Sequence, residues 1–387
     1  MLNVQQYLLN KYANADGDKL QRSIIALNDL ADNYSIKYNI WEDDLVVLNY
    51  DQINSPKYDP IIKECRSLVL ELGTWEIISR AFDRFFNLNE DPSQDIDITE
   101  LKAHEKVDGS LITVFNYNGK WLYRTKSVIM PTDIINNNAD MVTWKDRIEE
   151  GLVGFYKKAL YVPVTNSYIF ELTCRENRVV TKYANTEGRL TLLAIRNNER
   201  GFYMHKQYCD DIAKELLFSR PREFSFDTID HCLDSAKALR NLEEGYVMYD
   251  DQGVPICKVK NPAYVAAHRL RGEGVLSEKR ILDLIIMNEL DEYLAVFPED
   301  SELIEGYAVD FINMNIDIED VCCFIAEFTG TQKDFALYVM DNYKGISAIA
   351  FAIKQGKTPI EAWEGLTTNK KYNMILHYTN ERRQQCH

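Results

Sequence analysis

Lys106 lies in the segment whose residue types most favour chemistry, His104-Glu-Lys106-Val-Asp108-Gly109-Ser110. The segment predicts a strand that ends at the lysine and a tight glycine turn into the next strand, which would present the amine on a rigid rim. A lysine nucleophile must lose a proton, and its ordinary pKa of about 10.4 makes this rare at neutral pH unless burial or nearby cations lower it. Taken alone, the motif is also typical of a surface hairpin with a solvated lysine.

A carboxylate within an apolar strand is the second candidate. Phe170-Glu171-Leu172 places Glu171 where an unpaired charge would be costly to bury, so the side chain needs a partner. A ribose hydroxyl of a bound nucleotide is one such partner. An ion pair with Arg175 or Arg178 is the structural alternative.

A third group of candidates lies on a predicted hairpin. One strand opens at Glu244, and its partner ends in Lys258-Val259-Lys260, whose two lysines share a face because side chains in a strand alternate. Two cations on one face suit a polyphosphate, and they would also lower the pKa of a nearby Lys106. The alternative is an exposed basic edge that prevents strands of different molecules from pairing.

The elements that must position these residues are short strands between about 45 and 260. For example, the runs 111–115 and 121–125 flank Asn118-Gly119, a dipeptide typical of hairpins. We therefore expect antiparallel sheets with helices such as 141–160 packed outside, and a helical N-terminal segment of about 40 residues.

After Pro262 the sequence changes to apolar residues at helical spacing, as in 278–297 and 319–328. The chain has 387 residues, which is too long for one compact core. The prediction is an α+β fold: an antiparallel-sheet domain over residues 1–264 with helices outside, followed by an all-helical C-terminal domain over 265–387.

The charge and composition of the chain argue against several classes of protein. The net charge of −16 argues against a protein that coats nucleic acid, and between Arg280 and Lys333 there are thirteen Asp or Glu and no Lys or Arg. The N-terminus does not resemble a signal peptide, and no run of about 18 apolar residues occurs. Eight scattered cysteines include no CxxC pair. We expect a cytoplasmic protein with no membrane partner and no obligate protein partner.

Four of these motifs occur in the order that characterises the covalent nucleotidyltransferases, the superfamily of ligases and capping enzymes. They are Lys106-Val-Asp-Gly, Phe170-Glu171, Glu244-Gly-Tyr-Val and Lys258-Val-Lys260. The segments 64–66, 85–90 and 176–180 resemble the T-even-phage type of RNA ligase 1, and the resemblance covers about 45 to 270. That family carries an all-helical C-terminal domain where DNA ligases carry an OB-fold.

The resemblance implies a role for each matching residue. Lys106 would take AMP as a phosphoamide, Glu171 would hold the ribose, and Glu244 would support the metal-dependent steps. Lys258 and Lys260 would contact the phosphates. Further ATP-binding positions are implied at Tyr50, Arg66, Arg84, Phe86, Lys126 and Tyr264. Arg84 stands where the family has a lysine, which keeps the charge but changes its geometry.

The resemblance also implies ATP and Mg²⁺ as cofactors, with Mn²⁺ as a substitute. Hard oxygen ligands and phosphate substrates favour Mg²⁺, which offsets charge on transferred phosphoryl groups. An acidic pair early in the helical domain helps to place a metal in the family, and Asp291-Glu292 is the nearest match. The alternative for this pair is a solvated helix face.

The expected activity is ATP-dependent ligation of 5′-phosphate to 3′-hydroxyl RNA ends, through a lysyl-AMP and an RNA-adenylate. The substrate would be single-stranded RNA or cleaved tRNA, in RNA repair, within the host cytoplasm if the source is a phage. A DNA ligase or a capping-type nucleotidyltransferase is the alternative within the superfamily. A non-catalytic module that binds RNA ends is the alternative outside it.

Overall fold

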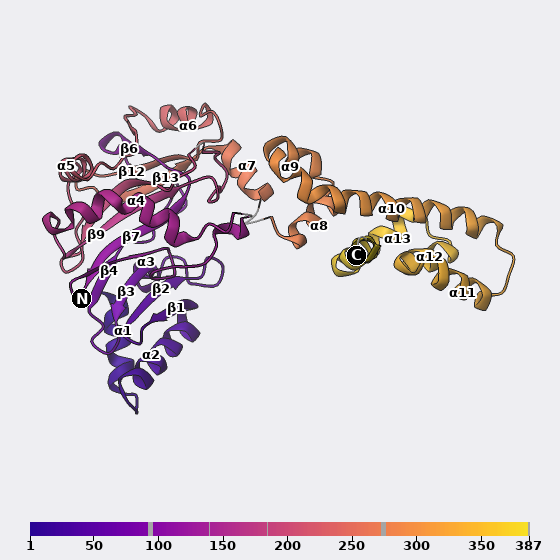
Figure 1. Cartoon of the computed structure of the whole chain (residues 1–387), viewed down its shortest axis with the longest axis horizontal. Coiled ribbons are helices and arrows are strands. Elements are labelled where there is room, and N and C mark those ends of the chain that lie inside the picture. Colours follow the sequence, from indigo (N-terminus) through magenta and orange to yellow (C-terminus); the bar gives the residue numbers. More distant parts are fainter. Residues whose placement is uncertain (92–95, 139, 184, 272–275, 386–387) are drawn as a thin grey trace. The chain divides into compact units, whose positions relative to one another are not determined.

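The computed structural model describes residues 1–91, 96–138, 140–183, 185–271 and 276–385, apart from a few side chains within these ranges. The chain divides into two compact units, Met1–His268 and Arg269–His387, each with its own core (Figure 1). The first unit is built on three sheets, and the second consists of helices.

The first sheet has the strand order β1-β2-β3-β4, and all its neighbours are antiparallel. Helices α1 and α2 share its core, where Leu8, Leu27 and Leu48 are fully buried. An Asp18 side chain caps α2 by accepting from the Gln21 backbone N–H. The elements of this layer are α1 (Asn3–Ala13), α2 (Lys19–Tyr34), α3 (Pro60–Glu64), β1 (Ile36–Trp41), β2 (Leu45–Tyr50), β3 (Arg66–Glu71) and β4 (Ile77–Arg80).

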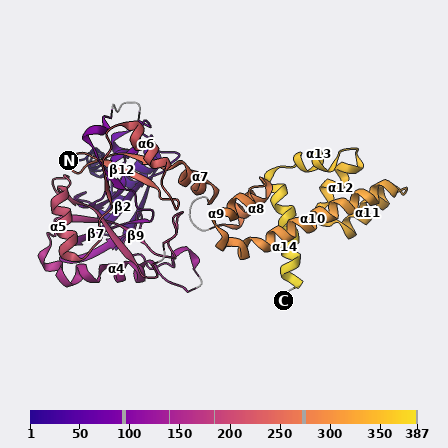
Figure 2. The ribbon, with the colours of Figure 1, turned by 90° about the horizontal axis from the view of Figure 1, so that it is seen from above.

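The second sheet has the order β10-β9-β7-β8 and is also antiparallel. The predicted hairpin is confirmed, because Asn118 (φ 51°) and Gly119 (φ 79°) turn the chain between β7 and β8. Helices α4 and α5 cover the outside of this sheet (Figure 2). Its elements are β7 (Ser110–Tyr117), β8 (Lys120–Arg124), β9 (Asn166–Thr173), β10 (Arg189–Asn197), α4 (Trp144–Lys158) and α5 (Lys206–Leu216).

The third sheet, of order β11-β6-β12-β13-β5, carries most of the residues that the sequence singles out. Its one parallel pair is β13 with β5, within an otherwise antiparallel set. Helix α6 packs on β13. The elements are β5 (Phe86–Asn87), β6 (Lys102–Glu105), β11 (Glu223–Phe224), β12 (Gly245–Tyr249), β13 (Pro255–Lys260) and α6 (Ile229–Lys237), and short 3-10 turns lie at Ile98–Glu100, Ile135–Asn137 and Ala159–Tyr161.

The second unit contains helices and two 3-10 turns in its described part. The 27-residue α10 is its spine, and α12 and α14 pack on it. The helices are α8 (Glu278–Ile286), α9 (Leu290–Val296), α10 (Ser301–Glu327), α11 (Gln332–Asn342), α12 (Ser347–Lys354), α13 (Pro359–Glu364) and α14 (Thr368–Gln385), and α7 (Pro262–Arg271) leads in from the first unit. The predicted α+β class with a helical C-terminal region is confirmed.

Membrane-spanning helices are absent from the part of the chain that the structure describes, since none there is both long and apolar enough.

Candidate active site

Lys106 follows β6 directly, and β7 begins at Ser110, as the sequence predicts. The backbone N–H of Lys106 donates to the carbonyl of Gly245 at 2.8 Å, which ties the lysine to the start of β12. Gly109 allows the chain to pass close to β9, because a Cβ there would lie 2.3 Å from the carbonyl oxygen of Leu172. The lysine therefore stands on a backbone that is fixed from two sides.

Asp108 is the residue of this loop whose contacts sequence reasoning missed. Its buried carboxylate accepts hydrogen bonds from the backbone N–H of Val180 at 2.9 Å and of Thr181 at 2.7 Å. The hydroxyl of Tyr264 in α7 donates to it at 2.7 Å. Asp108 thus joins the Lys106 loop to two distant segments. Its position two residues after the lysine is the sequence feature that could have identified it as a residue of the site.

Glu244 lies between two of the predicted lysines. Its Oε2 accepts from Lys106 Nζ at 2.5 Å, and its Oε1 lies 3.0 Å from Lys260 Nζ. Burial raises the pKa of the Glu244 carboxyl, but Lys106 and Lys260 lower it more strongly, so the net direction is down. The carboxylate is therefore charged and holds both ammonium groups.

The pKa of Lys106 is shifted in the direction opposite to that expected from the sequence. Burial lowers this pKa, but the carboxylates of Glu244, Glu171 and Asp108 raise it more, so the net direction is up. The expectation that Lys258 and Lys260 would depress it is wrong for the nucleotide-free protein. The reason is that Lys260 shares Glu244 with Lys106, so its charge is largely neutralised there.

Lys258 is a cavity lysine with no carboxylate partner among the described residues. Burial lowers its pKa to about 6, and the charges of Arg66, Lys106 and Lys260 act in the same direction. Its Nζ lies 4.6 Å from the ring centroid of Phe85, and no ion pair to it is present within the described residues. An anion in this place would stabilise the charged form of Lys258.

Glu171 lies in the middle of the second sheet, opposite Leu111 of β7 and Thr191 of β10. Burial raises the pKa of its carboxyl to about 8, although Lys106 acts against this. The alternative ion pair with Arg175 or Arg178 is not formed among the described residues. Arg175 pairs with Asp140 at 2.7 Å, and Arg178 donates to the carbonyl of Val180.

One cavity of about 270 Å³ brings the central candidates together. Four cations line it, together with the Glu171 carboxyl and an apolar wall. The cations are Arg66, Lys106, Lys258 and Lys260, and the apolar wall includes Phe82, Phe85, Leu111, Leu193, Val247 and Tyr249. Such a combination can hold an anion next to a flat apolar group.

Four further predicted residues form a neighbouring cluster outside that cavity. The Arg84 guanidinium lies over the ring of Tyr50 at 4.1 Å and over that of Phe86 at 5.4 Å. Lys126 Nζ lies 5.5 Å from the Tyr50 ring centroid. Tyr264 also acts from outside the cavity, through its bond to Asp108.

The predicted metal pair lies in the second unit. Asp291 and Glu292 occupy the first turn of α9, and both are exposed. Across the described ranges, no three or more His, Cys, Asp or Glu side chains are grouped so that they could hold a metal ion. Mg²⁺ is usually held by one or two carboxylates plus substrate phosphates, so a carboxylate beside phosphate-binding cations fits it.

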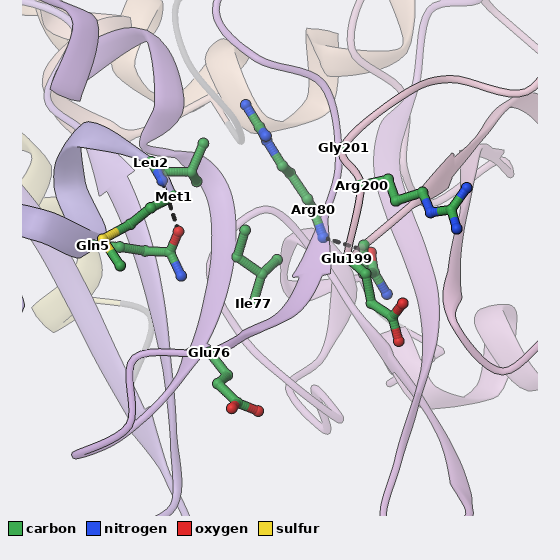
Figure 3. Close-up of a pocket in the computed structure, with 10 residues that line it drawn as sticks. Met1, Leu2, Gln5, Glu76, Ile77, Arg80, Glu199, Arg200 and Gly201 are labelled. Atoms are coloured by element: carbon green, nitrogen blue, oxygen red, sulfur yellow. Dashed lines mark hydrogen bonds between the residues drawn. The ribbon is translucent and has the colours of Figure 1, made fainter.

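A larger concavity of about 560 Å³ lies between the start of α1, β4 and the turn at Glu199–Gly201. None of its lining residues belongs to the Lys106 cavity. Figure 3 shows its charged side chains, Glu76, Arg80, Glu199 and Arg200, which do not point toward one another. They do not converge on a common point, and the Lys106 cavity is the better candidate site.

Comparisons with known proteins find relatives that are named as RNA ligases. The chain is 32% identical to a putative bifunctional polynucleotide kinase/RNA ligase of Autographa californica nuclear polyhedrosis virus, over 80% of this chain and 45% of that protein. A putative RNA ligase of Thermovibrio ammonificans is 25% identical, with 70% of each chain covered. An archaeal ATP-dependent RNA ligase structure gives a TM-score of 0.46 at 16% identity, covering 63% of this chain and 62% of that one.

The chain thus spans about half the length of the baculovirus relative. A family model described as RNA ligase matches residues 64–264, which is more than half of the chain and includes the Lys106 cavity. The chain belongs to the RNA ligase family.

Proposed function

We propose that the protein is an ATP-dependent RNA ligase that joins 5′-phosphate and 3′-hydroxyl RNA ends through an AMP carried on Lys106. The observation that supports this most directly is the meeting of Lys106, three other cations and Glu171 in one cavity. In the first step, Lys106 Nζ forms a bond to the α-phosphorus of ATP and pyrophosphate leaves. The RNA 5′-phosphate then takes the AMP, and a 3′-hydroxyl displaces the AMP as the strands join.

The cavity fits a nucleoside triphosphate. Lys258 is a buried lysine without a carboxylate partner among the described residues, and phosphate oxygens would stabilise its charged form. The partly buried carboxyl of Glu171 would accept hydrogen bonds from ribose hydroxyls. Positioning and electrostatic stabilisation are sufficient for phosphoryl transfer, so few acid-base groups are required.

Lys106 must lose a proton before it attacks. While it pairs with Glu244 it stays an ammonium, so the nucleotide-free protein holds its nucleophile in an inactive form. Its hydrogen-bond partner Glu244 is the nearest acceptor for that proton, and opening of this pair would be the step that releases the amine. We assign this function to Glu244.

Mg²⁺, or Mn²⁺ in its place, would supply neutralising charge to the transferred phosphate. Glu171, which lines the Lys106 cavity, and Glu244, which pairs with Lys106, are the carboxylates that fit it, in combination with phosphate oxygens. Asp291 and Glu292 remain a second proposal for metal binding, in a different unit of the chain.

RNA is the proposed substrate because the family that matches is that of RNA ligases. A DNA ligase or capping enzyme would share the lysine chemistry, but the described residues of the second unit form helices and no OB-fold. The name of the baculovirus relative also includes a polynucleotide kinase, an activity that yields 5′-phosphate ends, which supports a role in RNA or tRNA repair. Viral relatives favour the host cytoplasm as the location. A non-catalytic RNA-end-binding module is the remaining alternative.

We further propose that residues 1–264 perform the adenylyl chemistry and that 265–387 determine which RNA is sealed. The nucleotide motifs lie in the first segment, and the acid-rich run of the second cannot form a long basic groove.

The test is incubation of the full chain with ATP and Mg²⁺, followed by intact mass measurement and addition of 5′-phosphorylated RNA. A ligase gains one AMP and then joins RNA ends. A binding module gains nothing and leaves the ends open.

A further inference from the structure

A second cavity adjoins the Lys106 cavity, and Lys126 is its one charged side chain with a role in the account above, as an ATP-binding position implied by the family resemblance. Its volume is about 370 Å³, and it shares Gly109 and Leu111 with the Lys106 cavity. The two cavities therefore meet at the start of β7, within a few residues of Lys106. Lys258 and Lys260 line the Lys106 cavity but not the second one.

The volume of the second cavity distinguishes it from another cavity that also adjoins the Lys106 cavity. A third cavity shares Leu193 and Tyr249 with the Lys106 cavity but holds only about 130 Å³. The third cavity has about half the volume of the Lys106 cavity itself, so it is the less suitable of the two neighbours for a nucleotide. The second cavity is larger than the Lys106 cavity.

The walls of the second cavity combine an aromatic ring with groups that bind phosphate and sugar. Trp144 and Pro131 supply apolar surface, and Lys126 supplies a cation. Ser127 and Asp133 add a hydroxyl and a carboxylate. Unpaired RNA bases stack on aromatic side chains, while a nearby cation receives the phosphate.

Trp144 is held on a rigid element. It is the first residue of α4, and its backbone N–H donates to the carbonyl of Asp133 at 3.0 Å. Thr143 caps the same helix by accepting from the Asp146 N–H at 3.2 Å. The indole packs partly against the core of the second sheet, so its position does not depend on a bound ligand.

The backbone beside Lys126 is also fixed from several directions. Its carbonyl accepts from the Asn49 side-chain amide at 2.9 Å and from the Ser67 hydroxyl at 2.9 Å. These bonds join the segment after β8 to the first sheet. The aromatic and cationic walls are therefore both in place before any RNA binds.

We propose that this cavity binds the terminal nucleotide at the 5′-phosphate end of the RNA, with its base stacked on Trp144 and its phosphate near Lys126. The proposal rests on the proposed ligase function. It places the RNA phosphate across the Gly109 turn from the lysyl-AMP, which it must reach to accept the adenylyl group. The 3′-hydroxyl end then enters from elsewhere.

The experiment uses purified full-length protein already carrying AMP, mixed with 5′-phosphorylated single-stranded RNA. The transfer of AMP to RNA is followed as a function of RNA concentration for wild type, Trp144→Ala and Trp144→Phe. Tyr161→Ala is the matched control, because Tyr161 is an exposed aromatic residue at 82% exposure and lines neither cavity. Melting temperatures verify that each variant is folded.

Trp144→Ala should raise the KM for RNA about fivefold or more, since one stacked base typically contributes at least that factor. Trp144→Phe should recover most of the affinity, and Tyr161→Ala should match wild type. A folded Trp144→Ala protein with unchanged KM would overturn the proposal. So would a defect seen only when the concentration of the 3′-hydroxyl strand is varied with pre-adenylated RNA, because that result assigns the cavity to the other end.

Fluorescence keeps the test decisive if Trp144→Ala does not fold. A 5′-phosphorylated dinucleotide should quench the indole emission of wild type more than that of Trp144→Phe, and equal quenching would overturn the proposal. Failure of wild type to gain AMP from ATP would instead contradict the proposed ligase function, so the two failures are distinguishable.

Discussion

The two compact units of the chain differ most in how they arrange charge. In the first unit, cations from several strands surround carboxylates in the cavity at Lys106, and burial shifts the pKa of Lys258 and Glu171. In the second unit, α10 lies within a stretch of thirteen acids without a Lys or Arg, and most of its own acids are exposed.

The charges of the cavity at Lys106 favour the binding of phosphate, whereas the acidic surface of α10 disfavours it. Phosphate-binding energy comes largely from cations, which the first unit concentrates and α10 lacks. We therefore expect substitutions in the first unit to change the chemical steps, and changes in the second unit to affect mainly which RNA is used.

The largest effect should come from Lys106. Lys106→Ala removes the nucleophile, and Lys106→Arg replaces it with a guanidinium that does not deprotonate in proteins. Both variants should lose AMP labelling and RNA sealing completely, measured with radiolabelled ATP. Lys120→Ala is the matched control, since Lys120 is an exposed lysine at the start of β8. Normal labelling of either Lys106 variant would break the assignment of chemistry to the first unit.

Lys258→Ala should reduce the rate of AMP attachment by roughly 100-fold or more, because it removes the charge that Lys258 gains when a triphosphate binds. The carboxylates around Lys106, rather than Lys258, set the pKa of Lys106. At saturating ATP, which keeps Lys258 charged, the deficit should consequently stay constant between about pH 7 and 9 when rates are compared with wild type. Recovery of the rate at high pH would show that Lys258 lowers the pKa of Lys106 after all.

ATP binding should take up protons. The pKa of Lys258 is about 6 in the free protein, and a triphosphate raises it, so the lysine is neutral before binding and charged afterwards in the window above about pH 6. Affinity should fall by up to about tenfold per pH unit across that window. Calorimetry in buffers of different ionisation enthalpy should detect about one proton per ATP near neutral pH. Lys258→Met should abolish this uptake, and uptake that persists would assign it to another group.

Removal of the second unit should have a smaller effect on chemistry. A chain ending at Arg271 keeps α7, whose Tyr264 bonds to Asp108. If circular dichroism and melting show that it is folded, it should still attach AMP within a few-fold of the full chain, and join simple single strands. Its preference for a structured substrate such as cleaved tRNA should be lost. A folded truncation that cannot attach AMP would contradict this prediction, because it would show that residues of both units are required for the chemical step.

The smallest effect is expected for Asp291→Ala with Glu292→Ala. Both side chains are exposed on α9, and the described residues place no metal-binding cluster around them. AMP attachment should change by less than about threefold, as is usual for surface substitutions. A markedly raised Mg²⁺ requirement in the titration would instead confirm the metal role implied by the family resemblance.

Local geometry explains which features were predictable from the sequence. The hairpin at Asn118-Gly119 and the lysines at 258 and 260 follow from strand alternation and turn chemistry, which act over a few residues. The parallel pairing of β5 with β13 joins Phe86 to Cys257, and nothing in the sequence near either strand specifies it.

The direction of the pKa shift at Lys106 depends on contacts with residues far away in the sequence, which no local motif contains. Glu244 is 138 residues from Lys106 in the chain, and their separation of 2.5 Å reverses the expected direction of the Lys106 pKa. In the same way, Tyr264 reaches Asp108 across 156 residues. Such pairings arise from the packing of three sheets, so the types of the residues were predictable but their partners were not.

The central claim is that Lys106 carries AMP between ATP and RNA, and peptide mapping by mass spectrometry tests it most directly. Full-length protein incubated with ATP and Mg²⁺ should carry one AMP on the peptide that contains Lys106. Addition of 5′-phosphorylated RNA should move that AMP to the RNA and then release it as the ends are joined. AMP found on a different residue, or RNA ends joined while Lys106 stays unmodified, would contradict the account.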